Sequence, residues 1–170
     1  MEGFRTLTSV FSLGLSCGIF SKEMIIQWCD QAIEAKDNVP FEIIEVSLMS
    51  KSKIDDIENK LFELTGHFEV EHPAKLVLSI IYDKVNKKRI SIENGIRYST
   101  RLLTFTRLSF EGDYYSLYSM DDSYDCAKSG FHSDINDVIT EYLDLLDKYQ
   151  VYFEEFKNLY FLEMGNEWRS

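Results

Sequence analysis

The sequence predicts an all-α fold, a single helical domain of about seven or eight helices. Apolar residues recur at intervals of three and four over most of the chain, which is the period of one face of an α-helix. Residues that commonly start and end helices separate these apolar segments. The 170 residues fit one domain, residues 1–170, and an apolar content of 45% suffices for a hydrophobic core.

The first 20 residues are apolar enough to suggest a signal peptide, but small and polar residues interrupt the apolar run and no cleavage site follows it. We therefore expect this segment to belong to the fold. No run of 18 apolar residues occurs in the sequence, so we predict no membrane-spanning helix. Ser21 can cap a helix that extends to about Lys36.

Three further helices are predicted between residues 40 and 89. Pro40 suits the first position of a short helix. Ser52 and Asp55 have the spacing of a capping box, and Gly66 is placed to end the helix that they begin. After Pro73, an apolar stripe ends in a cluster of basic residues, which are favourable at the C-terminal end of a helix dipole.

Four further helices and one ambiguous stretch are predicted after residue 90. Ser91 can cap a helix that runs past residue 100. Residues 103–120 predict either the end of this helix followed by a loop, which we favour, or a small β-hairpin, because the stretch is rich in β-branched and aromatic residues. A short helix ended by Gly130 follows, then a helix capped by Ser133 and a last helix after residue 150.

Acidic charge is concentrated in the last third of the chain. The formal net charge is −11, of which residues 1–110 contribute −1 and residues 111–170 contribute −10. Such a surface would repel phosphates, so we expect no nucleic acid to bind there. The same charge would attract a basic protein. The alternative is that the acids only keep the protein in solution.

Residues 111–130, EGDYYSLYSMDDSYDCAKSG, combine four tyrosines with five acids and one base. Tyrosine offers a large and rigid contact surface, and neighbouring acids would steer a basic partner toward it. The helix predicted after Ser133 has an acidic outer face that reaches Asp144. We predict a partner-binding surface here, with one or two of the tyrosines packed inward. Its residues are Glu111, Asp113, Tyr114, Tyr115, Tyr118, Asp121, Asp122, Tyr124, Asp125, Asp134, Asp137 and Glu141.

No motif in the sequence predicts a catalytic site or a cofactor. Cys126 and His132 could act as nucleophile and base only if the fold brings them together, and the acids near Cys126 disfavour a thiolate. Acid pairs such as Asp121 and Asp122 are more often solvated than catalytic. A small hydrolase-like enzyme that uses these groups remains an alternative, as does a generic helical scaffold or regulatory domain.

Potential metal ligands gather in one short segment. His67, Glu69, Glu71 and His72 lie within six residues, but strand alternation would separate the two histidines, and no HExxH or CxxC pair occurs. We therefore predict no metal site.

The three cysteines are odd in number and widely spaced, which is typical of free thiols. Free thiols persist in a reducing compartment, so the cysteines predict a cytoplasmic location.

Residues 84–107 carry seven bases and one acid, Glu93. One interpretation is a nucleic-acid-binding patch. We favour another, in which Arg97 and Arg101, one helical turn apart, pair with acids of the C-terminal helices. Such pairs would join the two differently charged parts of the chain.

Two segments resemble a known class of proteins. They are FSLGLSCGIFSKEMIIQWCDQAIE followed by PFEIIEVSL, and DDSYDCAKSGFHSDINDVITEYLDLLDKY. Both are similar to segments of small helical bacterial immunity proteins from polymorphic-toxin and contact-dependent growth inhibition systems. The resemblance implies a cytoplasmic protein without enzymatic activity that binds one cognate toxin domain, often a basic nuclease. Such a protein would occlude the active site of the toxin or an adjacent surface.

Overall fold

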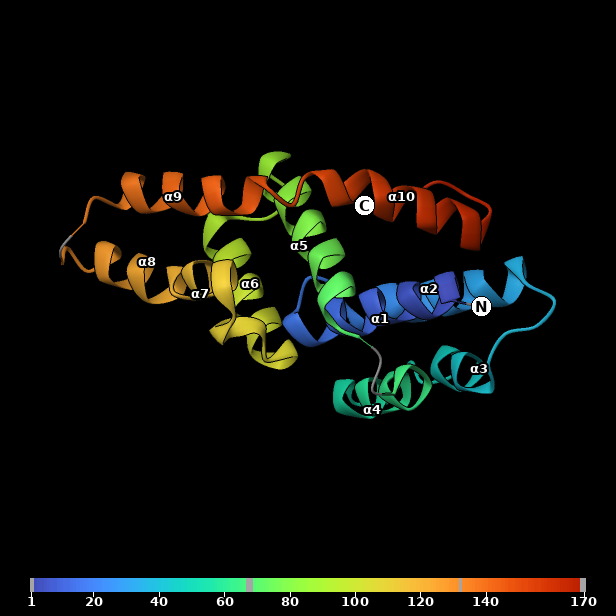
Figure 1. The fold of residues 1–170 in the computed structure, drawn as a ribbon. Helices are drawn as coiled ribbons and strands as arrows, with labels where there is room; N and C mark the ends of the chain where they lie inside the picture. The colour runs from blue at the N-terminus through green and yellow to red at the C-terminus, as the bar shows by residue number, and fades with distance from the viewer. Residues whose placement is uncertain (1, 67–68, 132, 169–170) are drawn as a thin grey trace.

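The computed structural model describes residues 2–66, 69–131 and 133–168, and every regular element among them is helical (Figure 1). The predicted all-α fold is therefore confirmed, but the predicted number of seven or eight helices is too low. At residues 103–120 both the favoured loop and the alternative of a β-hairpin are wrong. The described residues form ten α-helices and one 3-10 turn. They are α1 (Glu2–Cys17), α2 (Lys22–Ala35), α3 (Phe41–Ser47), α4 (Ile54–Thr65), α5 (Glu71–Asn86), α6 (Ile92–Thr106), η1 (Leu108–Phe110), α7 (Gly112–Tyr118), α8 (Met120–Lys128), α9 (Ile135–Asp147) and α10 (Val151–Met164).

Helices α1 and α5 lie near the centre of the molecule (Figure 1). α5 packs against α1, α6, α9 and α10, and α1 also contacts α4 and α6. Helices α2, α3 and α4 gather at one end, and α7, α8 and α9 at the other. A single set of buried apolar side chains joins the two ends, from Phe4 and Trp28 to Tyr124 and Tyr142. None of the described helices is long and apolar enough to cross a membrane.

Three of the predicted helix ends are confirmed. The Ser21 hydroxyl accepts a hydrogen bond from the Met24 amide at 3.3 Å, and the Ser91 hydroxyl accepts one from the Asn94 amide at 3.1 Å. Each bond satisfies an amide that has no partner within the helix. Gly66 ends α4 with φ of 60°, a backbone conformation that favours glycine.

Two predicted caps are wrong by one residue. α4 begins after Lys53, whose amide donates to the Asp56 carboxylate at 3.3 Å, and neither Ser52 nor Asp55 occupies the capping positions. α9 is capped by Asp134, whose carboxylate accepts from the amide of residue 136 at 2.7 Å, in place of Ser133. Serine and aspartate are both good caps, so their order in a run of polar residues does not decide which one acts.

No helix was predicted over α1, although Phe4, Leu7, Phe11 and Leu15 recur there at helical spacing. Residues 6–11 are all buried, so most sides of this part of α1 face other helices. The buried set includes the polar residues Thr6, Thr8 and Ser9, which interrupt the apolar run in the sequence. Gly14 belongs to this close packing, since a Cβ atom there would lie 2.2 Å from the Phe20 ring.

Residues 103–120 fold as helical segments joined by tight turns. α6 extends to Thr106, and Arg107 then adopts a left-handed conformation with φ of 60°. η1 and α7 follow, and Gly112, the first residue of α7, has φ of 42°. The apolar residues that suggested a hairpin, such as Leu108 and Leu117, are buried against the core.

Candidate protein-binding surface

Residues 112–147 form a helical hairpin at the end of the molecule away from α3 and α4 (Figure 1). α7 and α8 make one leg, α9 makes the other, and α9 packs against both α7 and α8. Gly130, with φ of 79°, lies in the turn after α8. α6 supports the hairpin through contacts with α7 and α8. Most of the predicted partner-binding residues therefore share one structural unit.

The four tyrosines of this hairpin differ in exposure. Tyr114 and Tyr124 are buried, at 8% and 9% exposed, and Tyr118 is half-buried. The Tyr114 hydroxyl donates to the Glu71 carboxylate at 3.0 Å, which ties α7 to the start of α5. Only Tyr115, at 57% exposed, offers most of its ring to solvent. Tyr114 and Tyr124 therefore offer little surface to a partner, which confirms the expectation that one or two of the tyrosines pack inward.

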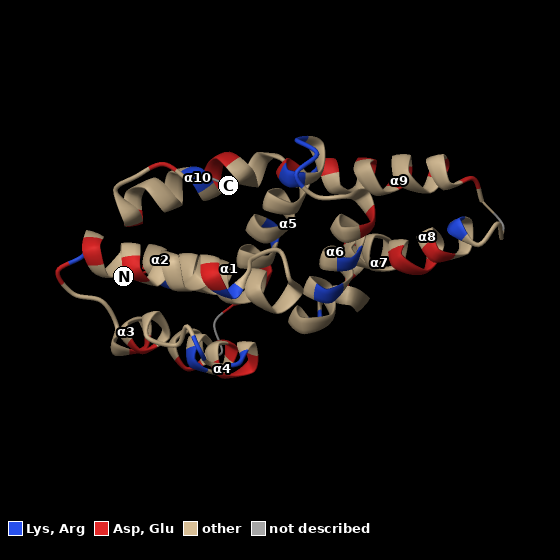
Figure 2. Ribbon diagram, turned by 180° about the vertical axis from the view of Figure 1, so that it is seen from behind, with Lys and Arg blue, Asp and Glu red and all other residues tan. Residues whose placement is uncertain are grey.

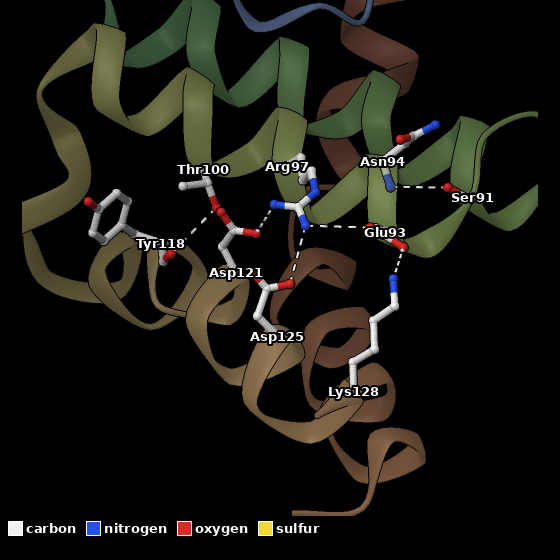
Figure 3. Close-up of polar contacts among 9 residues, drawn as sticks. All are labelled: Ser91, Glu93, Asn94, Arg97, Thr100, Tyr118, Asp121, Asp125 and Lys128. Carbon is white, nitrogen blue, oxygen red and sulfur yellow. Dashed lines mark hydrogen bonds and ion pairs between the residues drawn. The ribbon is translucent and has the colours of Figure 1, made fainter. Parts of the chain in front are cut away.

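Several of the predicted acids belong to an ion-pair network between α6 and α8 (Figure 3). The Arg97 guanidinium lies 3.0 Å from the Asp121 carboxylate, 3.2 Å from that of Asp125 and 3.4 Å from that of Glu93. The Lys128 ammonium lies 3.0 Å from Glu93. Burial raises the pKa of Asp121, and the Arg97 charge opposes this shift. The predicted pairing of Arg97 with C-terminal acids is confirmed, so Asp121 and Asp125 hold α8 against α6.

Replacing Arg97 with glutamine is expected to loosen α8 locally. The substitution leaves Asp121 and Asp125 side by side without their counter-charge, and like charges in contact repel. We expect faster amide hydrogen exchange throughout residues 120–128, with little change in the midpoint of global unfolding, because exposed ion pairs contribute little to overall stability. Lys51→Gln removes an exposed charge at the other end and serves as the control. Unchanged exchange in α8 would contradict the assigned role of Arg97.

Four acids form a continuous stripe along the outer side of α9. Asp134, Asp137, Glu141 and Asp144 follow one another at spacings of three, four and three residues, which places them on one side of the helix. All four are exposed, and Tyr142 marks the opposite, buried side. Figure 2 shows acidic residues repeated along α9. We call these four residues the α9 stripe; it is about 15 Å long at the rise of an α-helix.

The α9 stripe differs from the network acids in lying outside the ion pairs that join α6, α7, α8 and α9. Lys148, one helical turn after Asp144, pairs instead with Asp113 of α7 at 3.1 Å. Asp134 also accepts the hydrogen bond that caps α9. The remaining predicted acids, Glu111 and Asp122, are exposed. Asp137, Glu141 and Asp144 thus direct their charge outward.

The residues considered for catalysis do not form a catalytic site within the described part of the chain. Cys126 is exposed on α8, and His132 lies outside the described part of the chain. The Asp121 carboxylate accepts a hydrogen bond from Arg97, whereas the neighbouring Asp122 is exposed to solvent. The prediction of a protein without enzymatic activity stays a prediction.

The segment considered for a metal makes other contacts. The His72 imidazole lies 2.7 Å from the Glu155 carboxylate, and Glu71 bonds Lys75 and Tyr114. His67 is outside the described residues. Within the described ranges, no group of three or more histidine, cysteine, aspartate or glutamate side chains has a metal-binding arrangement.

The other two thiols are buried in the core. Burial raises the pKa of both Cys17 and Cys29 to about 12, from an ordinary value of 9.0. A thiol in this state is a poor nucleophile, because the thiolate is the reactive form. Neither residue is therefore suited to nucleophilic catalysis.

The buried thiols predict a loss of stability at alkaline pH. In the unfolded chain both thiols ionise near pH 9, whereas in the folded chain they stay protonated up to about pH 12. Their contribution is therefore fully present below pH 9 and is lost as the pH rises through this window. Between pH 8 and pH 10 we expect a loss of about 1.4 kcal/mol per thiol in the free energy of unfolding, measured by urea denaturation.

A double variant, Cys17→Ala and Cys29→Ala, should remove this part of the pH dependence. The Cys126→Ala variant is the control, because that thiol is exposed and should leave the pH dependence unchanged. An equal pH dependence in the wild type and the double variant would contradict the assignment.

The basic run at residues 84–107 does not form one free patch. Lys84 is buried, and desolvation lowers its pKa. Lys87 pairs with Asp83 at 2.7 Å, and Arg97 belongs to the network described above. Burial and ion pairs within the chain therefore occupy several of the charges that a nucleic-acid-binding surface would need.

Asp144, the last residue of the acidic outer face predicted from the sequence, is exposed and continues the α9 stripe three residues after Glu141.

Comparisons of the chain with protein-family models, with curated proteins and with solved structures found no match.

Proposed function

We propose that this chain is an immunity protein that binds a basic toxin domain through the α9 stripe and the neighbouring part of the helical hairpin. The observation that carries the proposal is the α9 stripe itself, four exposed carboxylates on one side of a helix that lie outside the ion pairs joining α6, α7, α8 and α9. The family assignment rests on the sequence resemblance.

Electrostatics explain how such a surface would work. Carboxylates aligned over about 15 Å create a negative potential that draws a positively charged partner into the correct orientation. Tyr115 on α7 adds a large, exposed aromatic side chain on the other leg of the hairpin. A nuclease binds phosphates through basic residues, so an acidic helix could occupy the same surface and exclude the nucleic acid.

Co-expression tests this proposal. The toxin candidate to test is the C-terminal domain of any large secreted protein that is encoded immediately upstream of this chain. We expect cells that express this domain to grow only when the chain is also present, and the two proteins to purify as a complex. Growth arrest in the presence of the folded chain would refute the immunity function.

A further inference from the structure

A second candidate interaction surface lies on α3, at the end of the molecule away from the helical hairpin (Figure 1). α3 packs against α2 and α4, and its inner side consists of Ile43 and Val46, which are both fully buried. A helix at the surface of a protein normally carries polar residues on its outer side. The outer side of α3 is apolar as well, so a second surface of this helix is suited to burial.

Three large apolar side chains form this outer side. Phe41, Ile44 and Leu48 follow one another at spacings of three and four residues, and Leu48, the C-cap of α3, keeps helical dihedral angles, so the three lie in one row. They are 68%, 38% and 78% exposed, respectively. Single exposed apolar side chains are common, but a contiguous row of them is typical of a surface that another molecule covers. We call these three residues the α3 row.

The α3 row is complementary in shape to a second copy of itself. Ile44 lies in the middle of the row, with an apolar side chain on either side of it. A two-fold axis relates identical surface patches, so each residue of one copy meets its counterpart at the mirrored position of the row. When two copies of α3 pack antiparallel, both copies of Ile44 lie close to the axis, and each Phe41 meets Leu48 of the partner subunit.

The charges at the two ends of α3 favour this antiparallel arrangement. Glu42 lies in the first turn of the helix, and the exposed Lys51 follows its C-terminal end. Antiparallel packing brings Glu42 of one copy near Lys51 of the partner subunit, twice by symmetry, whereas parallel packing would bring like charges together. Glu45, the other acid of α3, is held by Lys60 of α4 at 3.1 Å. Glu42 is therefore the acid of α3 that we assign to the contact.

We propose that the α3 row is a dimerisation surface, on which a second copy of this chain packs through its own α3 in antiparallel orientation. The surface is small, so the dimer is weak, with a dissociation constant on the order of 50 µM. The α9 stripe of each copy lies at the end of the molecule away from α3 and stays uncovered in the dimer (Figure 1). Dimerisation and the proposed toxin binding can therefore fail independently of each other.

Sedimentation velocity over a concentration series tests the dimer. Between about 5 and 500 µM we expect the wild type to change from the mass of one chain to the mass of two. Leu48→Lys removes an apolar contact and should weaken dimerisation at least about tenfold. Leu162→Lys makes the same substitution on α10 at a side chain that is also 78% exposed, and this control should dimerise as the wild type does. A single-chain mass at every concentration, or equal weakening in the two variants, would overturn the proposal.

A charge exchange tests the antiparallel orientation. Glu42→Lys and Lys51→Glu each place like charges in contact across the interface, so each alone should weaken the dimer about fivefold. The double variant, which carries both substitutions, restores opposite charges and should recover the dissociation constant of the wild type. Circular dichroism checks that each variant is folded. A folded double variant that dimerises no better than the single variants would overturn the antiparallel contact.

Discussion

Replacing Tyr142 with alanine is expected to lower the free energy of unfolding by about 4 kcal/mol, because truncation of a buried aromatic side chain leaves a cavity. Tyr142 is fully buried in α9, and its hydroxyl forms a 3.0 Å hydrogen bond with the Ser99 hydroxyl of α6. A Cβ atom at Gly95 would lie 3.0 Å from the Tyr142 hydroxyl oxygen, so the absence of a side chain at this position of α6 leaves room for the tyrosine. Urea denaturation followed by helical circular dichroism measures the loss.

Tyr115→Ala is the matched control for this experiment. It makes the same substitution in the same hairpin, but at a side chain that is 57% exposed. A surface substitution of this kind should change the free energy of unfolding by no more than about 0.5 kcal/mol. Similar losses for the two variants would mean that α9 is not held to the core through Tyr142.

Reversing two charges of the α9 stripe is expected to slow association with the basic partner by about 100-fold at low salt. Asp137→Lys combined with Glu141→Lys changes the charge of the stripe by four units, from −4 to 0, and removes its attraction for a basic partner. Stopped-flow association rates measure the effect directly. Salt screens exposed charges, so the difference from the wild type should shrink as ionic strength rises.

A control variant separates the stripe from the overall charge. Asp30→Lys with Glu34→Lys makes the same change at the same four-residue spacing, on the exposed side of α2. Both variants have the same net charge, but only one alters α9. Equal slowing in the two variants would show that total charge governs association and that the α9 stripe has no special role.

Local pattern was sufficient to predict most helices of this fold. Helices such as α6 and α9 have one apolar and one polar side, so their periodicity and their caps at Ser91 and near Asp134 are readable in the sequence. α1 has the same periodicity, but it also buries Thr6, Thr8 and Ser9, so its buried surface is wider than its apolar stripe. α7 has only seven residues, and its direction depends on the turn at Arg107, which no local sequence pattern predicts.

The candidate surface was predictable only where it lies on one helix. The α9 stripe follows from helical spacing alone. The roles of Asp121 and Asp125 depend on Arg97, and the burial of Tyr114 depends on Glu71; both partners are distant in sequence. Tertiary packing therefore decided which members of the tyrosine-rich stretch stay exposed.

Carboxylate footprinting of the complex with the toxin domain tests the central claim most directly. A carbodiimide and an amine label exposed carboxylates, and mass spectrometry compares the free and bound chain residue by residue. Binding through the α9 stripe predicts strong protection of Asp137, Glu141 and Asp144, with unchanged labelling of Asp30 and Glu34. Undiminished labelling of the three stripe residues in a complex that forms stably would contradict the account.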